Sequence, residues 1–139
     1  MTSVHTVPES WLQSSGVMAT SLDPSLLPLE GVLRLGPYEV PLFQRRYCWG
    51  EPEWAALWDA LAGLVADPDP STGHSLRRLL VFSRPGRPAL VLDGQQRLTS
   101  CTLLLAALRD AAAAAGLEVP AASLASLLDG ALQPTLDDR

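Results

Sequence analysis

The apolar pattern of the chain changes its period at Asp93. The residues before it, 88 to 92, form an apolar run typical of a short strand, and apolar residues recur at helical spacing from 95 to 115. Gly94 permits a positive φ, and the backbone N–H groups after it would lie at the positive end of a helix dipole, which stabilises an anion such as phosphate. Arg97 adds a permanently charged guanidinium suited to phosphate oxygens. Junctions of a strand, a turn and a helix also occur without any ligand. On this pattern alone, a phosphate site is therefore a hypothesis.

The remaining pattern predicts a small α/β domain. Residues 1–24 lack sustained periodicity, and we expect a mobile lead-in with at most a short helix from 9 to 13. The other predicted segments are a helical turn from Asp23 through Leu27, a bend at 31–37, a strand at 38–43 that Pro41 places at an edge or ends, a helix from 51, strands at 76–83 and 88–92 joined by a Pro85-Gly86 turn, the helix at 95–115 stopped by Gly116, a helix from about 120 to 132, and a polar tail at 133–139.

Two features are predicted to belong to the hydrophobic core. The helix from 51 carries apolar residues at helical spacing between Trp54 and Val65, which indicates one wide buried face. Cys48 and Cys101 lie in apolar surroundings and form neither a disulfide framework nor a metal knuckle. We therefore interpret both cysteines as small core residues.

Composition and charge narrow the class of protein. With 139 residues, 47% of them apolar and 18% charged, the chain predicts one globular domain. It has no signal-peptide pattern and no apolar run of about 18 residues, so we expect a cytoplasmic protein without a membrane partner. The net charge of −5 argues against a general nucleic-acid coat, yet residues 40–97 hold seven Arg against six Asp or Glu. Anions are best tolerated there, although Arg77, Arg78, Arg84 and Arg87 also fit ordinary surface positions.

Two motifs, Phe43-Gln-Arg-Arg-Tyr-Cys-Trp49 and Val91-Leu-Asp-Gly-Gln-Gln-Arg-Leu-Thr-Ser100, resemble the N-terminal domain family of GmrSD-type modification-dependent restriction endonucleases. A Leu57-Trp58 pair on the helix between them fits the same family, and the resemblance extends over residues 40–105. It implies a fold similar to ParB/sulfiredoxin: an α/β (α+β) domain over residues 25–132 with a small mixed sheet and flanking helices.

The resemblance also implies a function. Such domains bind and hydrolyse a nucleoside triphosphate as regulatory sensors in modification-dependent restriction or anti-phage defence, coupled to an HNH-type nuclease domain or subunit. DNA would then be contacted through the assembled complex. A homo-oligomer of this chain is also possible under the resemblance. The positions matching the family motif are Asp93, Gly94, Gln95, Gln96 and Arg97, with Gln44 and Arg45 in support.

The roles implied for these positions follow the chemistry of phosphoryl transfer. Arg97 would neutralise phosphate charge, Gly94 and the following amides would cradle a phosphate, and either Gln95 or Gln96 would orient the attacking water. Asp93 would hold Mg²⁺ directly or through water. A purely structural alternative has Asp93 capping the helix and Arg97 pairing with a carboxylate. Tyr47 and Trp49 are expected to pack under the site.

This chain departs from the family pattern at two points. The family often has His-x-Leu-Gly before its central strands, whereas here the sequence reads His74-Ser75-Leu76-Arg77. Arg77 either obstructs the ligand or reaches its phosphates, and His74 fits an ordinary surface residue. The sequence also has no Asn and only two His, so it cannot supply an HNH site and is not itself a nuclease by that mechanism.

Two other functions compete with a nucleoside triphosphatase. The first is a non-catalytic module, a stand-alone or truncated copy that binds DNA or a partner protein. The second is a ParB-like DNA clamp, which is weaker because no basic helix-turn-helix follows Gly116. The nucleotide and the DNA modification that is sensed are not specified by the sequence.

Overall fold

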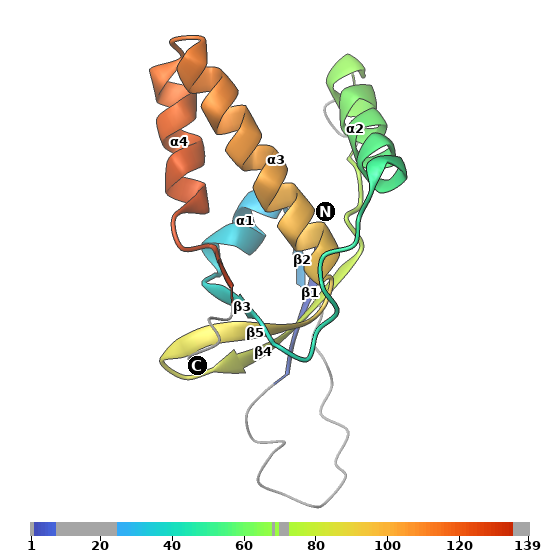
Figure 1. Ribbon diagram of the computed structural model, residues 1–139, viewed down its shortest axis with the longest axis vertical. Helices are drawn as coiled ribbons and strands as arrows, with labels where there is room; N and C mark the ends of the chain where they lie inside the picture. The colour runs from blue at the N-terminus through green and yellow to red at the C-terminus, as the bar shows by residue number, and fades with distance from the viewer. Residues whose placement is uncertain (1, 8–24, 68, 70–72, 135–139) are drawn as a thin grey trace, which may run out of the picture.

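The chain forms a mixed α+β domain, and the computed structural model describes residues 2–7, 25–67, 69 and 73–134. Helices α1, α3 and α4 lie on one side of a sheet, and α2 stands at its end (Figure 1). The elements in chain order are β1 (Thr2–Val7), β2 (Ser25–Leu27), α1 (Leu29–Arg34), β3 (Tyr38–Val40), α2 (Glu51–Ala66), β4 (Arg78–Arg84), β5 (Arg87–Asp93), α3 (Gln95–Ala114), α4 (Glu118–Leu128) and β6 (Leu132–Pro134).

The six strands form one sheet in the order β2-β1-β4-β5-β3-β6. The central pair, β4 and β5, is an antiparallel hairpin whose turn contains Gly86 at a φ of 69°. Strand β1 runs parallel to β4, and β3 runs parallel to both β5 and β6. The sheet is therefore mixed, as the sequence predicts, and its hairpin carries β5 directly to the start of α3.

The core lies between this sheet and the helices on its one side. Val81 and Val91 from the hairpin pack with Val32 of α1 and Leu98 of α3, and Val91 is fully buried. Tyr38 is also buried, and its hydroxyl donates a hydrogen bond of 2.7 Å to the Val32 carbonyl oxygen. Burial raises the pKa of Tyr38 to about 12, so this hydroxyl keeps its proton at any ordinary pH.

The N-terminal prediction is wrong for residues 2–7, which form β1. Their sequence, Thr-Ser-Val-His-Thr-Val, is rich in β-branched residues, which favour strands, and β1 pairs with both β2 and β4. Residues 25–27 pair with β1 as a strand and not as a helical turn. Most of the predicted bend at 31–37 belongs to α1. The short helix predicted at 9–13 lies outside the described residues.

Two further boundaries differ from the prediction. Helix α4 ends at Leu128, and residues 132–134 pair in parallel with β3, so the predicted polar tail begins inside a strand. The strand predicted at 38–43 ends at Val40, as the following Pro41 led us to expect. The remaining tail, 135–139, is not among the described residues.

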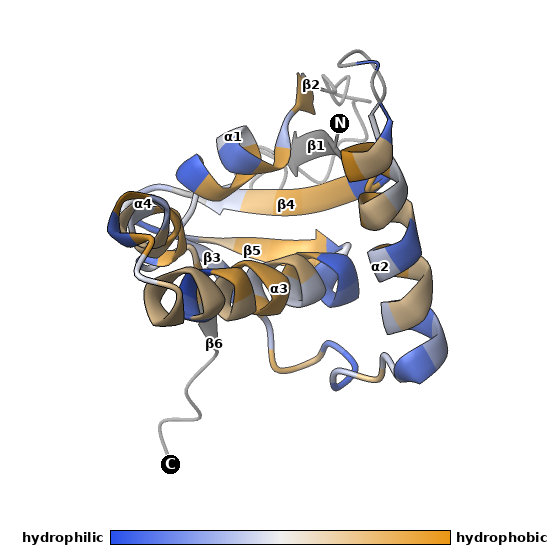
Figure 2. Ribbon diagram, turned by 90° about the horizontal axis from the view of Figure 1, so that it is seen from above, coloured by the Kyte–Doolittle hydropathy of each residue, from blue (hydrophilic) through white to orange (hydrophobic). Residues whose placement is uncertain are grey.

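The predicted core face of α2 is also wrong, although the helix itself is present at Glu51–Ala66. Only Leu57 is buried in it, whereas Trp58 is 59% exposed and Val65 is 90% exposed. Helical spacing of apolar residues indicates that one face of a helix is apolar. It does not show which part of the molecule, if any, packs against that face. In the described part of the chain, α2 stands at the end of the sheet beside the start of α3 (Figure 2). In that part of the chain, no helix combines the length and the apolar content needed to cross a membrane.

We predict that β1 is required for stability. Val4→Pro should lower the free energy of unfolding by about 3 kcal/mol, because Val4 pairs with β2 on one side and β4 on the other and proline removes a backbone donor. Glu118→Pro, at the first position of α4, is the matched control and should change it by less than about 0.5 kcal/mol. Chemical denaturation measures both. Equal stability of the Val4→Pro variant and the native protein would show that β1 is dispensable.

Candidate functional site

The site is built around the turn that joins β5 to α3. Gly94 has a φ of 93°, which favours glycine, and a Cβ added there would lie 2.9 Å from Leu79 Cδ1 and 3.1 Å from the Arg78 carbonyl oxygen. The Leu98 N–H donates to the Gly94 carbonyl oxygen at 3.0 Å, which begins the helix. The turn therefore needs glycine for both its conformation and its close contact with β4. This confirms the predicted strand, turn and helix.

The amino end of α3 has no side-chain cap. The first backbone N–H groups of an α-helix have no acceptor within the helix, and at this helix they belong to Gln95, Gln96 and Arg97, which all line the cavity described below. The Gly94 N–H is different, because it donates to Asp93 Oδ1 at 2.8 Å. The predicted phosphate site therefore loses the Gly94 N–H and keeps only the amides after Gly94.

Arg97 is fixed at the same turn. Its Nη2 donates a hydrogen bond of 2.6 Å to the Arg78 carbonyl oxygen, which anchors one end of the guanidinium to β4. Within the described part of the chain, Arg97 has no carboxylate partner. Asp93 does not cap the first turn either, because it bonds Gly94 and its Oδ2 lies 3.8 Å from an Arg78 nitrogen. The purely structural alternative therefore does not describe this turn.

The first motif packs against the second through side-chain hydrogen bonds. Gln44 Nε2 donates to the Leu92 carbonyl oxygen at 2.9 Å, at the end of β5. The buried side chain of Gln96 accepts from the Cys48 N–H at 2.8 Å and donates to the Arg46 carbonyl oxygen at 3.1 Å. Residues 44–48 are thereby held against the first turn of α3, about 50 residues away along the chain.

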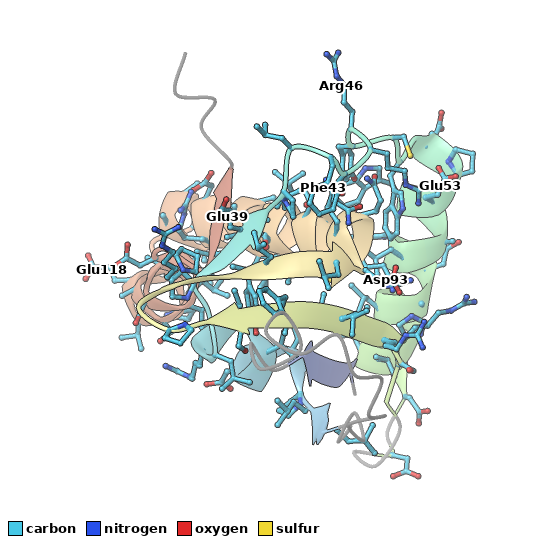
Figure 3. All side chains as sticks on the ribbon, turned by 90° about the horizontal axis from the view of Figure 1, so that it is seen from below. Glu39, Phe43, Arg46, Glu53, Asp93 and Glu118 are labelled. Atoms are coloured by element: carbon cyan, nitrogen blue, oxygen red, sulfur yellow. The ribbon has the colours of Figure 1, made fainter. Side chains whose placement is uncertain are left out.

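These contacts surround one cavity of about 420 Å³. All seven predicted site residues line it, and Asp93 lies at the end of β5 beside α2 in Figure 3. His74 and Arg77 line it as well, from the segment before β4. The predicted residues in its wall are Gln44, Arg45, Asp93, Gly94, Gln95, Gln96 and Arg97.

Helix α2 contributes a wall that the sequence did not predict. Glu53, Ala56 and Leu57 line the cavity from this helix, and Trp49 lines it from the loop before it. Glu53 lies in the first turn of α2, where a carboxylate favours the positive end of the helix dipole, and its Oε2 accepts a hydrogen bond of 2.9 Å from the Gly50 N–H. No motif signals that the same side chain also faces a cavity. Its position follows from the docking of the loop by Gln96.

Two of the three aromatic residues of the first motif, Tyr47 and Trp49, contact neighbouring side chains. The Tyr47 hydroxyl and Ser100 Oγ are 2.8 Å apart, which joins the loop to α3 a second time. The Trp49 ring packs edge-on against Trp54, with ring centroids 6.3 Å apart and an interplanar angle of 87°. Tyr47 stays partly exposed while its hydroxyl contacts α3, whereas Trp49 lines the cavity.

The adjacent glutamines Gln95 and Gln96 have different roles. Gln96 is 6% exposed and both ends of its amide are hydrogen-bonded to the loop. Gln95 lines the cavity, and its Oε1 is a buried acceptor with no hydrogen-bond partner among the described residues. A buried acceptor without a donor is unfavourable unless a ligand or water supplies the donor. Gln96 is therefore committed to the loop, whereas the Gln95 side chain is not.

The cavity wall carries three arginines and two carboxylates, a surplus of one positive charge that favours an anion. Arg45, Arg77 and Arg97 line it against Glu53 and Asp93. In the described part of the chain no three His, Cys, Asp or Glu residues gather as a metal cluster. Asp93 fits Mg²⁺ only as a single carboxylate, which is the usual protein share when phosphates and waters supply the other ligands.

The two cysteines differ in their burial. Cys101 is buried and lines the cavity, and burial raises the pKa of its thiol to about 11 although the nearby Arg97 charge lowers it. The prediction of a core residue is confirmed there. Cys48 is exposed, so the same prediction is wrong for it. Its backbone N–H carries the contact to Gln96, and its side chain is not needed for it.

We predict that stability separates the two glutamines. Gln96→Ala should lower the free energy of unfolding by about 2 kcal/mol or more, because the Cys48 N–H and the Arg46 carbonyl oxygen lose their partners. Gln95→Ala should change it by less than about 0.5 kcal/mol, because it removes an acceptor that has no partner. Urea denaturation of the two variants provides the comparison. A larger loss for Gln95→Ala would contradict these assignments.

Comparison with known proteins agrees with the two motifs. No curated protein and no solved structure gives a significant match to this chain. The model of one family, described as GmrSD restriction endonuclease, N-terminal domain, matches residues 29–133. This range runs from α1 into β6 and contains every residue named above as lining the cavity. Because the match covers most of the chain, the protein belongs to the GmrSD restriction endonuclease N-terminal domain family.

Proposed function

We propose that this domain binds and hydrolyses a nucleoside triphosphate as the regulatory part of a modification-dependent restriction or anti-phage defence system. The observation that carries the proposal is the cavity itself. Side chains from two motifs about 50 residues apart line it at the uncapped amino end of α3. Its volume, about 420 Å³, falls within the range of small-molecule sites.

The phosphates belong at the first turn of α3. The amides of Gln95, Gln96 and Arg97 and the positive end of the helix dipole favour a phosphate there. Arg97 supplies the main cation, and its bond to the Arg78 carbonyl oxygen limits the side-chain freedom that binding would otherwise remove. Arg45 adds a second charge from the first motif, and Gln44 keeps the end of β5 in position.

Gln95 is the residue that orients the attacking water. Gln95 lines the cavity, and a rotation of its side chain would let the unpartnered Oε1 accept a hydrogen bond from a water near the terminal phosphate, as glutamines do in other phosphoryl-transfer sites. Gln96 has both amide ends committed to the loop and is a positioning residue. Asp93 would hold Mg²⁺, which supplies charge neutralisation to the phosphates when bound.

The rest of the nucleotide fits the less polar wall. Trp49, Ala56 and Leu57 line the cavity together with Glu53. An aromatic ring and two apolar side chains suit the faces of a nucleobase, and a carboxylate can accept from base or ribose donors. These residue types do not specify which nucleobase is bound.

DNA cleavage in such a system requires residues from elsewhere. The sequence has no Asn and only two His, so an HNH nuclease would be supplied by another domain or subunit. DNA would be contacted through that assembly, in the cytoplasm. The exposed apolar residues of α2, Trp58 and Val65, also suit a protein contact and support the alternative of a non-catalytic binding module.

We predict that hydrolysis and binding respond to different residues. Gln95→Ala should keep nucleotide binding and lower kcat by about 100-fold, because only the water loses its acceptor. Arg97→Ala should abolish detectable binding, because it removes the central phosphate cation. Phosphate release with Mg²⁺ and each NTP, together with calorimetric binding, measures both effects.

The control is Arg46→Ala, because Arg46 is an exposed cation of the same loop that points away from the domain in Figure 3. It should retain native binding and turnover. If the native protein binds no nucleotide near 1 mM, the nucleotide proposal fails and the non-catalytic module is the remaining reading.

A further inference from the structure

Arg77 has an unusual backbone conformation. Its φ is 62°, and it is the one non-glycine residue with a positive φ in the part of the chain that the structure describes. Side chains rarely adopt this region because Cβ approaches the following carbonyl oxygen. Such residues persist where the surrounding structure holds them, and they gather at functional sites.

The position of Arg77 connects this strain to the cavity. Arg77 lines the cavity, and its backbone N–H donates to Ser75 Oγ at 3.2 Å. The next residue, Arg78, contributes the carbonyl oxygen that accepts from Arg97. The same oxygen would lie 3.1 Å from a Cβ at Gly94. Arg77 therefore enters the cavity wall one residue from the atom that anchors Arg97.

Within the described residues no carboxylate pairs with the Arg77 guanidinium, whereas the neighbouring Arg78 lies 3.8 Å from Asp93. A strained backbone that holds an unpaired cation at an anion-favouring cavity has a simple explanation if the cation contacts the anion. A turn that required only a left-handed residue would be better served by glycine.

We propose that Arg77 binds the phosphate chain of the nucleotide beside Arg97. This inference rests on the proposed function. It assigns Arg77 to substrate binding and makes its left-handed backbone the consequence of placing the guanidinium in the cavity. The opposite possibility, an Arg77 that blocks ligand access, is an outcome of the test.

A set of substitutions separates charge from strain. Arg77→Ala removes the charge and keeps the unfavourable φ, Arg77→Gly removes both, and Arg77→Lys keeps the charge without the planar fork. Isothermal titration with each Mg-NTP and with inorganic tripolyphosphate should show about a ten-fold higher Kd for both the Ala and Gly variants. The Lys variant should fall between them and the native protein.

Thermal unfolding supplies the second readout. Arg77→Gly should raise Tm by about 2 to 5 °C, because glycine adopts this φ without strain, while Arg77→Ala should leave Tm nearly unchanged. A variant that is more stable and binds the phosphates less tightly is not expected from a residue with a merely structural role. Unchanged or tighter binding of the Gly variant would show that Arg77 is neutral or obstructive.

Two reference variants keep this inference distinct from the proposed function. Arg97→Ala should lose binding, and Arg46→Ala should keep it, as the exposed side chain of Arg46 points away from the domain. If Arg97→Ala loses binding but the Ala and Gly variants at position 77 bind like the native protein, only the role of Arg77 is overturned. If the native protein binds neither nucleotide nor tripolyphosphate, the proposed function is overturned together with it.

Discussion

The contact of Gly94 with β4 is the constraint on which the site depends. Because a Cβ at this position would lie 2.9 Å from Leu79 Cδ1 and 3.1 Å from the Arg78 carbonyl oxygen, β4 and the start of α3 can approach only through glycine. That approach brings Arg97 within hydrogen-bonding distance of Arg78. It also points the uncapped end of α3 into the cavity. The turn that we propose for phosphate binding therefore depends on the same contact that packs α3 against β4.

Gln96 extends this constraint to the first motif. Its two hydrogen bonds fix the loop at Arg46 and Cys48, and the loop in turn places Arg45 and Trp49 in the cavity wall. The adjacent Gln95 contributes no such bond, and its buried Oε1 has no partner among the described residues. Under the proposed function the two glutamines divide the work, Gln96 for assembly of the site and Gln95 for its chemistry.

The sequence predicted the local features of the site but not its complete wall. Period changes located the β4–β5 hairpin and the start of α3, because these depend on neighbouring residues. Residues 2–7 and 132–134 were misassigned because they become strands only by pairing with distant ones. The glutamines looked equivalent in sequence, and only the position of the loop distinguishes them. The strain at Arg77 likewise depends on the fold around it.

Helix α2 shows the limit of amphipathic patterns. Its apolar face was predicted to be core, yet Trp58 and Val65 are exposed in the described structure while Glu53 and Leu57 face the cavity. The helix closes one side of the site and leaves apolar surface on another. Under the proposed function, α2 would supply both a wall for the nucleotide and an exposed surface for a partner protein.

The central claim is that the start of α3 holds the phosphates of a nucleotide. A crystal structure of the protein with Mg²⁺ and a non-hydrolysable nucleoside triphosphate tests it most directly. The account predicts phosphate oxygens within hydrogen-bonding distance of the Arg97 guanidinium and the amides after Gly94, with Gln95 Oε1 facing the terminal phosphate. A nucleotide bound elsewhere, with this turn closed by the protein's own side chains, would contradict it.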